Sequence, residues 1–301
     1  MQPAQPLISV LMPYYQTVDF LEEAIHSVMA QTYREWELLL IDDGATDGSQ
    51  EIARHWAETY PDRIRLLTHP DGGHHGLPAT RNLGLAQAKG AYTALLDADD
   101  VWLPEKLEHQ ITLATRYPHC ALFGEASLYW YSWQHTGGTD TLIYPGITLD
   151  EPIDPPRAAL ELYPLGTGAA PCPSSLLMNT AVLRELGGFE TAFSGPYMVY
   201  EDQALLAKFY LQKTVFFSSS CLNRYRQRPQ SLVSELHQRQ NYWQIHRYFL
   251  KWLEQYVHTH CPDPDPRILQ AIRRAKRKSS IWQRALQQVR AVLSVHASAK
   301  G

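Results

Sequence analysis

Short apolar runs that alternate with helical patterns constrain the fold of this chain more than any other feature. The runs at 7–12, 37–41, 64–67 and 91–96 are rich in strand-forming residues, and apolar residues recur at helical spacing in the segments between them. Strands that alternate with helices form a largely parallel sheet covered on both faces. We therefore predict an α/β fold, in which ligands bind beyond the carboxyl ends of the strands.

Carboxylates follow two of the predicted strands. Asp42 and Asp43 come directly after the second strand, and Asp97 and Asp99 come directly after the fourth. The carboxyl ends of parallel strands lie at one edge of a sheet, so both clusters are expected at the same edge. Isolated buried carboxylates are costly, and the spacing of Asp97 and Asp99 suits oxygen ligation of Mg²⁺ or Mn²⁺ better than a tetrahedral zinc site.

The second acidic cluster also has a plainer interpretation, as a solvated turn in front of a helix. A helix is expected to begin near Leu103, and carboxylates are favoured before a helix N-terminus. We predict that Asp100 caps this helix. Two acidic clusters at one sheet edge favour a ligand site for the other carboxylates.

Charge and motif content argue against several classes of protein. The net charge of −4 over 301 residues argues against a general affinity for nucleic acid. No Gly-x-Gly-x-x-Gly fingerprint follows the first strand and no Walker loop occurs, which argues against common dehydrogenases and P-loop enzymes. The four cysteines are far apart, and we see no signal-peptide pattern and no long apolar run. We therefore expect a cytoplasmic protein in a reducing compartment. Adjacent histidines rarely point at one ion, so we expect no metal site at His74 and His75.

The segment 128–172 combines clustered aromatic residues with many glycines and prolines. This composition predicts loops and turns with little regular structure. The aromatic rings could stack on a sugar or another acceptor, or they could cover the sheet edge and fill the core. A basic loop is predicted at 225–229.

A helical extension is predicted after residue 235. Its last helix carries apolar residues at alternating steps of four and three from Ile268 to Leu293, and nine basic residues but no acidic ones lie between Arg267 and Lys300. Three arrangements remain open: packing back on the domain, peripheral contact with an anionic membrane, and a homodimer. We expect packing within the chain first.

Short motifs occur in order between residues 7 and 234. They are SVLMPYY at 9–15, SVMAQT at 27–32, IDDGATDGS at 41–49, ATRNLG at 79–84, LLDADD at 95–100, LGGF at 186–189, ED at 201–202 and YR at 225–226. This ordered set resembles the family 2 nucleotide-sugar glycosyltransferases. The resemblance implies the GT-A fold over 1–235, a mixed and mostly parallel sheet flanked by helices, with the C-terminal helical extension at 236–301.

The resemblance also implies a binding site for the nucleotide of the donor. Asp43, or its neighbour Asp42, would accept hydrogen bonds from uracil or another base, in a pocket shaped by Pro13 and Tyr15. Arg81 would lie against the nucleotide.

The acidic turn at the fourth strand would hold the rest of the donor. Asp97 and Ala98 would contact the nucleotide, with Asp97 at the ribose, and Asp99 would hold a divalent metal, Mn²⁺ or Mg²⁺, that bridges the diphosphate. Such a metal offsets the charge that builds on the departing nucleoside diphosphate.

Asp202 would be the general base of an inverting displacement. Glu201, Arg226 and Arg228 are further candidates for contacts with the diphosphate or the acceptor. Many relatives have a histidine where this chain has Arg228, which cannot ligate metal but can contact a diphosphate. The Gln-x-x-Arg-Trp signature of processive members is absent, which favours transfer of a single sugar.

The sequence thus predicts a metal-dependent inverting glycosyltransferase. It would move one sugar, from a UDP-sugar in the first instance, to a hydroxyl group of a saccharide or glycolipid. One alternative is a catalytically inactive member that serves as a binding or scaffold module. The other is a sugar nucleotidyltransferase, which would need a Gly-rich, Arg-containing loop after the first strand.

Overall fold

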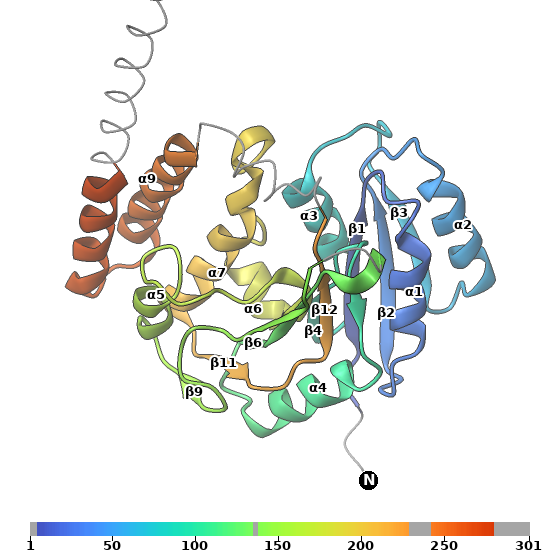
Figure 1. Cartoon of the computed structure of the whole chain (residues 1–301), viewed down its shortest axis with the longest axis horizontal. Helices are drawn as coiled ribbons and strands as arrows, with labels where there is room; N and C mark the ends of the chain where they lie inside the picture. The colour runs from blue at the N-terminus through green and yellow to red at the C-terminus, as the bar shows by residue number, and fades with distance from the viewer. Residues whose placement is uncertain (1–4, 135–137, 229–241, 280–301) are drawn as a thin grey trace, which may run out of the picture.

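The computed structural model describes residues 5–134, 138–228 and 242–279. Its centre is an eight-stranded sheet with the order β3-β2-β1-β4-β10-β6-β11-β9 (Figure 1). The strands are β1 (Ile8–Tyr14), β2 (Trp36–Asp42), β3 (Ile64–Thr68), β4 (Tyr92–Leu95), β6 (Leu122–Glu125), β9 (Pro152–Ile153), β10 (Leu177–Asn179) and β11 (Val215–Ser218). Strands β1 to β4 pair in parallel, and β10 runs antiparallel to β4 and β6. The predicted α/β class with a mixed sheet is confirmed.

Alternate residues of the central strands face two different helical layers. In β1, Val10 and Met12 pack into one core cluster, and Leu11 packs into the other. The first layer contains α1 (Leu21–Met29), α2 (Ser49–Thr59) and α4 (Lys106–Arg116), and the second contains α3 (Leu77–Gln87), α6 (Thr180–Glu185) and α7 (Glu201–Gln212). Burial on both faces explains why these strands are apolar along their whole length.

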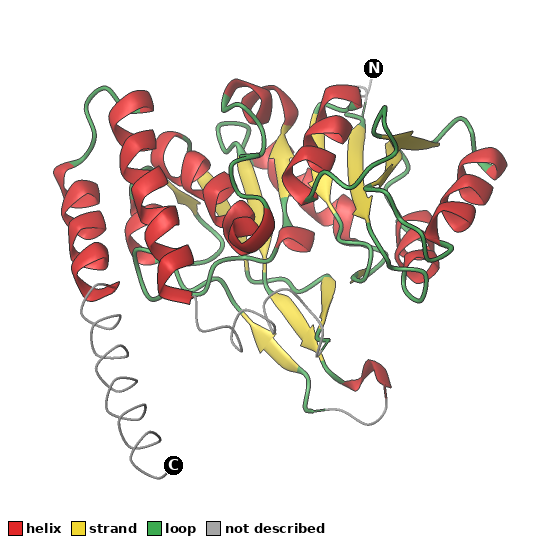
Figure 2. Cartoon of the chain, turned by 90° about the horizontal axis from the view of Figure 1, so that it is seen from above, coloured by secondary structure: helices red, strands yellow, loops and turns green. Residues whose placement is uncertain are grey.

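A smaller sheet with the order β5-β12-β7-β8 projects from the main body (Figure 2). Its strands are β5 (Val101–Trp102), β7 (Ser127–Trp130), β8 (Thr141–Ile143) and β12 (Asn223–Arg226). The segment 128–172 consists mostly of loops and turns, as predicted, but it also contains β8, β9, most of β7 and the short helix α5 (Arg157–Glu161). The predicted basic loop is wrong at its start, because Tyr225 and Arg226 are the last residues of β12.

The C-terminal helices pack against the domain that precedes them. Helix α9 (Tyr242–His260) buries Phe249 in the same core cluster as α7 and β11, and the helix over 266–279 adds Ile268 to that cluster. The described part of the extension therefore folds back on the domain, while membrane contact and a homodimer stay predictions. The predicted boundary at residue 235 lies outside the described residues. Within the described chain, no helix has the length and apolar character needed to cross a membrane.

Candidate active site

The turn after β4 brings three carboxylates together. The backbone N–H of Asp100 donates to the carbonyl oxygen of Asp97 at 2.9 Å, with Asp99 between them. Asp100 is fully buried, and its carboxylate accepts hydrogen bonds from Ser174 Oγ at 2.5 Å and from the backbone N–H of Arg226 at 2.9 Å. Burial and the two neighbouring carboxylates raise the pKa of Asp100 well above its usual range. The predicted helix cap is wrong, because α4 begins further along the chain and Asp100 ties the turn to β12 instead.

Asp99 forms an ion pair with Arg228. Nη2 of Arg228 lies 2.5 Å from Oδ2 of Asp99, and the two side chains are 25% and 19% exposed. Burial raises the pKa of Asp99, the Arg228 guanidinium opposes that shift, and the charge of Asp97 adds to it. The predicted metal ligand is thus paired with a cation of the protein itself.

Arg226 is held by acidic groups and aromatic rings. Its Nε donates to the carbonyl oxygen of Asp99 at 2.6 Å, and its Nη2 donates to Oε2 of Glu23 in α1 at 2.5 Å. The guanidinium carbon lies 4.5 Å from the ring centre of Trp130 and 4.9 Å from that of Trp133. With its side chain only 3% exposed, Arg226 joins the small sheet to the main one.

Arg81 connects the acidic turn to the N-terminus of α7. It has no exposed surface, and its Nη2 donates to Oδ1 of Asp97 at 2.6 Å while its Nη1 donates to Oε1 of Glu201. Burial raises the pKa of Glu201 to about 7 despite the opposing charge of Arg81. Arg81 therefore fixes two candidate residues relative to each other, and its predicted contact with a nucleotide stays a prediction.

Asp202 follows Glu201 in the first turn of α7 and is partly exposed. Its carboxylate accepts hydrogen bonds from the backbone N–H of Gln203 at 2.7 Å and from Nε2 of the same residue at 3.2 Å. Burial raises the pKa of Asp202, although these hydrogen bonds and Arg81 oppose the shift. A raised pKa makes this carboxylate a stronger base than an ordinary aspartate.

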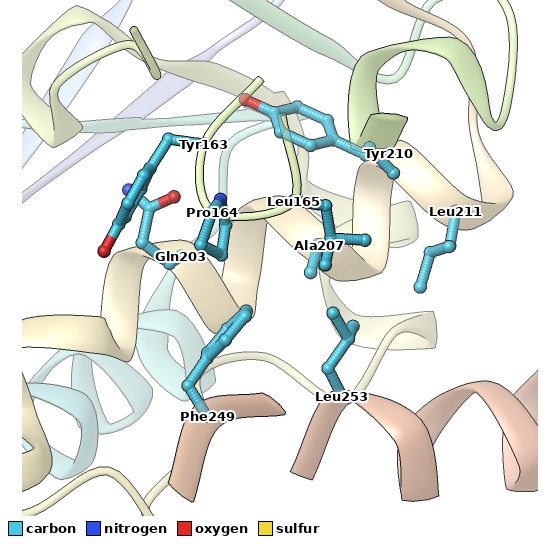
Figure 3. A pocket seen from close by; sticks show the side chains of 10 residues that line it. Tyr163, Pro164, Leu165, Gln203, Ala207, Tyr210, Leu211, Phe249 and Leu253 are labelled. Carbon is cyan, nitrogen blue, oxygen red and sulfur yellow. The ribbon is translucent and has the colours of Figure 1, made fainter. Parts of the chain in front are cut away.

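The N-terminus of α7 is also attached to the C-terminal extension. The hydroxyl groups of Tyr163 and Tyr200 are hydrogen-bonded, and that of Tyr163 lies 3.1 Å from the hydroxyl of Tyr242 in α9. A small apolar pocket lies beside them, lined by side chains from α7, α9 and the segment after α5 (Figure 3). Residues outside the recognisable motifs thus support the helix that carries Asp202.

The acidic pair after β2, Asp42 and Asp43, accepts hydrogen bonds from other groups of the protein. Asp42 accepts from the backbone N–H of Ala45 at 2.9 Å and from Nε2 of Gln50 at 2.8 Å. Asp43 accepts from the backbone N–H groups of His75 at 2.8 Å and Gly76 at 3.1 Å. Both carboxylates shape loops that precede helices, and their predicted contact with a base is untested.

The sequence did not single out His74 as a partner of this pair. Nδ1 of His74 lies 3.0 Å from Oδ2 of Asp43, and its ring centre lies 4.2 Å from that of Tyr15, which is 45% exposed. Pro13 is buried in β1 opposite Ile41. The structure thus brings Tyr15, Asp43 and His74 together. In the sequence, the only sign of this contact is the position of His74 in a glycine-rich loop.

The turn after β4 has donors that fit a divalent metal. Among the residues that the structure describes, no three histidine, cysteine or acidic side chains converge to form a complete site. Asp97 and Asp99 interact electrostatically, and their described ion pairs use Oδ1 of Asp97 and Oδ2 of Asp99. Mg²⁺ and similar ions are commonly held by one or two carboxylates together with substrate phosphates. Asp97 and Asp99 fit this mode of metal binding, and the Arg228 guanidinium would compete with the metal for Asp99.

Comparison with known proteins gives a consistent result. A family model described as glycosyl transferase family 2 matches residues 9–172. The chain is 30% identical over 186 residues to the putative glycosyltransferase EpsE of Bacillus subtilis (strain 168), covering 62% of this chain and 61% of EpsE. It is 35% identical over 118 residues to the Escherichia coli UDP-Glc:alpha-D-GlcNAc-diphosphoundecaprenol beta-1,3-glucosyltransferase WfgD, covering 39% of this chain and 45% of WfgD. The chain thus spans less than two thirds of either relative.

Solved structures share the fold. S. aureus TarS 1-349 in complex with UDP-GlcNAc matches with a TM-score of 0.62 and 18% identity, over 88% of this chain and 69% of that one. The mannosyltransferase PcManGT from Pyrobaculum calidifontis, in complex with GDP-Man and Mn²⁺, matches with a TM-score of 0.57 and 17% identity, over 97% of this chain and 81% of that one. At these identities the matches establish the fold alone.

Proposed function

The chain belongs to glycosyl transferase family 2 and has the GT-A fold, and on this premise we propose a metal-dependent, inverting transfer of one sugar from a nucleotide-diphosphate sugar. The acceptor would be a hydroxyl group of a saccharide or a lipid-linked saccharide. One observation carries the proposal: Arg81 joins Asp97 to Glu201, the neighbour of Asp202 in the first turn of α7, and the charges of Arg81 and Asp97 both act on the Asp202 carboxylate. This supports a proposal in which Asp202 is the base and the acidic turn binds the donor.

The donor that we propose is a UDP-sugar. WfgD is named for UDP-Glc and the TarS structure holds UDP-GlcNAc, whereas PcManGT holds GDP-Man. In this chain the exposed ring of Tyr15, with Asp43 and His74 beside it, would receive the base. Asp97 would meet the ribose, next to the buried Ala98.

Asp99 and Asp97 would hold the divalent metal, which when bound supplies Lewis-acid stabilisation of the departing diphosphate. Mn²⁺ in the PcManGT structure supports this part of the proposal. Arg228 would donate hydrogen bonds to the diphosphate, since a guanidinium matches phosphate oxygens in geometry and charge.

The carboxylate of Asp202 would accept the proton of the acceptor hydroxyl as its oxygen attacks the anomeric carbon. The bond between that carbon and the diphosphate oxygen breaks in the same step, and the nucleoside diphosphate leaves with the bonding electrons. A single displacement inverts the configuration at the anomeric carbon. Glu201, whose pKa is about 7 and whose Oε1 is held by Arg81, would keep the first turn of α7 in place.

Asp202→Asn tests this assignment. Turnover of UDP-glucose and UDP-GlcNAc, measured as UDP release, should fall by about 10²–10⁴ because the base is lost. UDP binding by calorimetry should stay within about twofold, since Asp202 does not touch the donor in this mechanism. Asp62→Asn, a change to an exposed aspartate outside the site, is the matched control. Near-normal turnover would remove Asp202 from the role of base, and a wild type that binds UDP but transfers nothing would support the inactive binding module.

We also infer peripheral contact with an anionic membrane, where a lipid-linked acceptor would be found. Arg273, Arg274, Arg277 and Lys278 are exposed on the helix over 266–279. Each basic residue near an anionic surface contributes about 1 kcal/mol. Wild type should float with phosphatidylglycerol vesicles, and the double variant Arg273→Glu/Arg277→Glu should not. Equal flotation of the two proteins would rule this contact out.

A further inference from the structure

Arg228 forms an ion pair with Asp99, the carboxylate that is proposed to hold the metal. Its Nη2 lies 2.5 Å from Oδ2 of Asp99, and its guanidinium carbon lies 5.0 Å from the ring centre of Phe20. Within the described chain its Nε has no hydrogen-bond partner. Among the described residues, one carboxylate and one aromatic ring contact this guanidinium, and a quarter of the side chain is exposed.

Arg226, two residues earlier, is constrained far more tightly. It is ion-paired to Glu23, donates to the carbonyl oxygen of Asp99 and lies over several aromatic rings. Its own backbone N–H is bonded to the buried carboxylate of Asp100. Arg226 therefore fixes the end of β12 beside the acidic turn, and the next arginine along the chain is free to change partner.

The Arg228 guanidinium occupies Oδ2 of Asp99, and its positive charge opposes a divalent ion that approaches either oxygen of this carboxylate. A metal that arrives alone therefore binds Asp99 weakly while the ion pair is in place. A nucleoside diphosphate removes this obstacle, because its phosphate oxygens offer a guanidinium a bidentate, doubly charged partner.

We propose that Arg228 exchanges partners when the donor binds, from Asp99 in the free enzyme to the diphosphate in the complex. The exchange frees Asp99 for the metal, so metal and nucleotide bind with positive cooperativity. Coupling between two ligands is reciprocal and is commonly 5- to 150-fold. This inference rests on the proposed function and adds to it an order of ligand binding. Asp99 binds the metal weakly until the nucleotide is present.

Binding of Mn²⁺, followed by the paramagnetic resonance signal of the free ion, tests the exchange without any measurement of activity. In wild type, a saturating concentration of UDP should raise the affinity for Mn²⁺ by about 10- to 100-fold. In Arg228→Gln, affinity for Mn²⁺ without UDP should rise about tenfold, and the further gain on adding UDP should be about tenfold smaller than in wild type, with the remainder supplied by the phosphate oxygens as metal ligands.

Two further variants control for charge and for folding. Arg224→Gln removes an arginine of β12, the strand that precedes Arg228. Arg224 lies over Trp130 and, in the part of the chain that the structure describes, forms no ion pair with the acidic turn. It should behave as wild type. Arg228→Lys keeps the charge, so its affinity for Mn²⁺ without UDP should stay low.

Two results would overturn the exchange. One is an Arg228→Gln variant that folds as wild type by circular dichroism and binds Mn²⁺ alone no better than wild type does. The other is cooperativity between UDP and Mn²⁺ that persists in full without Arg228. A wild type that binds no UDP with or without Mn²⁺ would instead overturn the proposed function, and the exchange with it.

Discussion

The two acidic turns at the edge of the sheet look alike in the sequence and differ in their partners. After β2, Asp42 and Asp43 accept hydrogen bonds from backbone N–H groups of the loops that follow, and Asp42 also accepts from the side chain of Gln50 in α2. After β4, Asp97 and Asp99 are paired with the guanidinium groups of Arg81 and Arg228. The carboxylates of the first turn are bonded mainly by backbone N–H groups of nearby loops. Those of the second turn are paired with arginines from α3 and from the segment after β12.

This difference indicates which carboxylates can change partners. A backbone amide in a packed loop cannot leave its acceptor without unfolding the loop, whereas a partly exposed arginine can rotate away. Asp42 and Asp43 therefore first stabilise the loops around them, and the side chains of Tyr15 and His74 lie beside Asp43. Asp99 is the carboxylate whose partner is most easily exchanged.

The largest effect is expected when the same substitution is made in both turns. Asp99→Asn should reduce UDP release from UDP-sugars by at least about 100-fold while the free energy of unfolding changes by less than about 1 kcal/mol. Asp42→Asn should lower the free energy of unfolding by about 1–3 kcal/mol, because its amide would face the donors of Ala45 and Gln50. Urea unfolding and UDP release measure the two effects.

The contrast between the two turns would be wrong if Asp42→Asn lost turnover and Asp99→Asn lost stability. An Asp42→Asn protein of normal stability that had lost turnover would move the ligand site to the turn after β2. An Asp99→Asn protein that kept its Mn²⁺-stimulated binding of UDP would show that the metal is held elsewhere.

The sequence predicts the strands and both acidic turns because these depend on local patterns. Apolar alternation with helices is visible within ten to twenty residues, and β1, β2 and β4 begin and end within about two residues of the predicted runs. The acidic residues were placed correctly because they follow directly from the ends of those strands.

The predictions that failed depended on contacts between distant residues. Asp100 accepts from Arg226 and from Ser174 rather than capping a helix, and no local pattern shows either partner. The end of β12, Tyr225 and Arg226, was predicted as the start of a loop, because this short run, rich in arginine, becomes a strand only by pairing with β5 and β7. Arg81 and Glu201 were each noticed, but their contact crosses 120 positions of the chain.

A smaller effect separates the surroundings of the two acidic turns by the pH dependence of stability. The pKa of Glu201 is about 7 in the folded protein, above its ordinary value of 4.5, so the folded state binds the proton more tightly than the unfolded state does. The stabilisation from this group is fully present below pH 4.5 and is lost as the pH rises to 7. The loss should be of the order of 1–3 kcal/mol in wild type, measured by urea unfolding from pH 4.5 to 7.5.

Glu201→Gln should flatten this profile, because the amide keeps an acceptor for Arg81 but has no proton to lose. Asp71, in the loop beside the first acidic pair, supplies the opposite sign: its hydrogen bonds to His75 and to the backbone of Gly73 lower its pKa. Its contribution is present above its ordinary pKa of 3.8 and is lost as the pH falls below that value. Asp71→Asn should therefore leave the interval from pH 4.5 to 7.5 unchanged. If Glu201→Gln keeps the slope of wild type over that interval, the buried carboxylate of Glu201 is already ionised at low pH, and the two acidic turns do not differ in the pH dependence of the groups beside them.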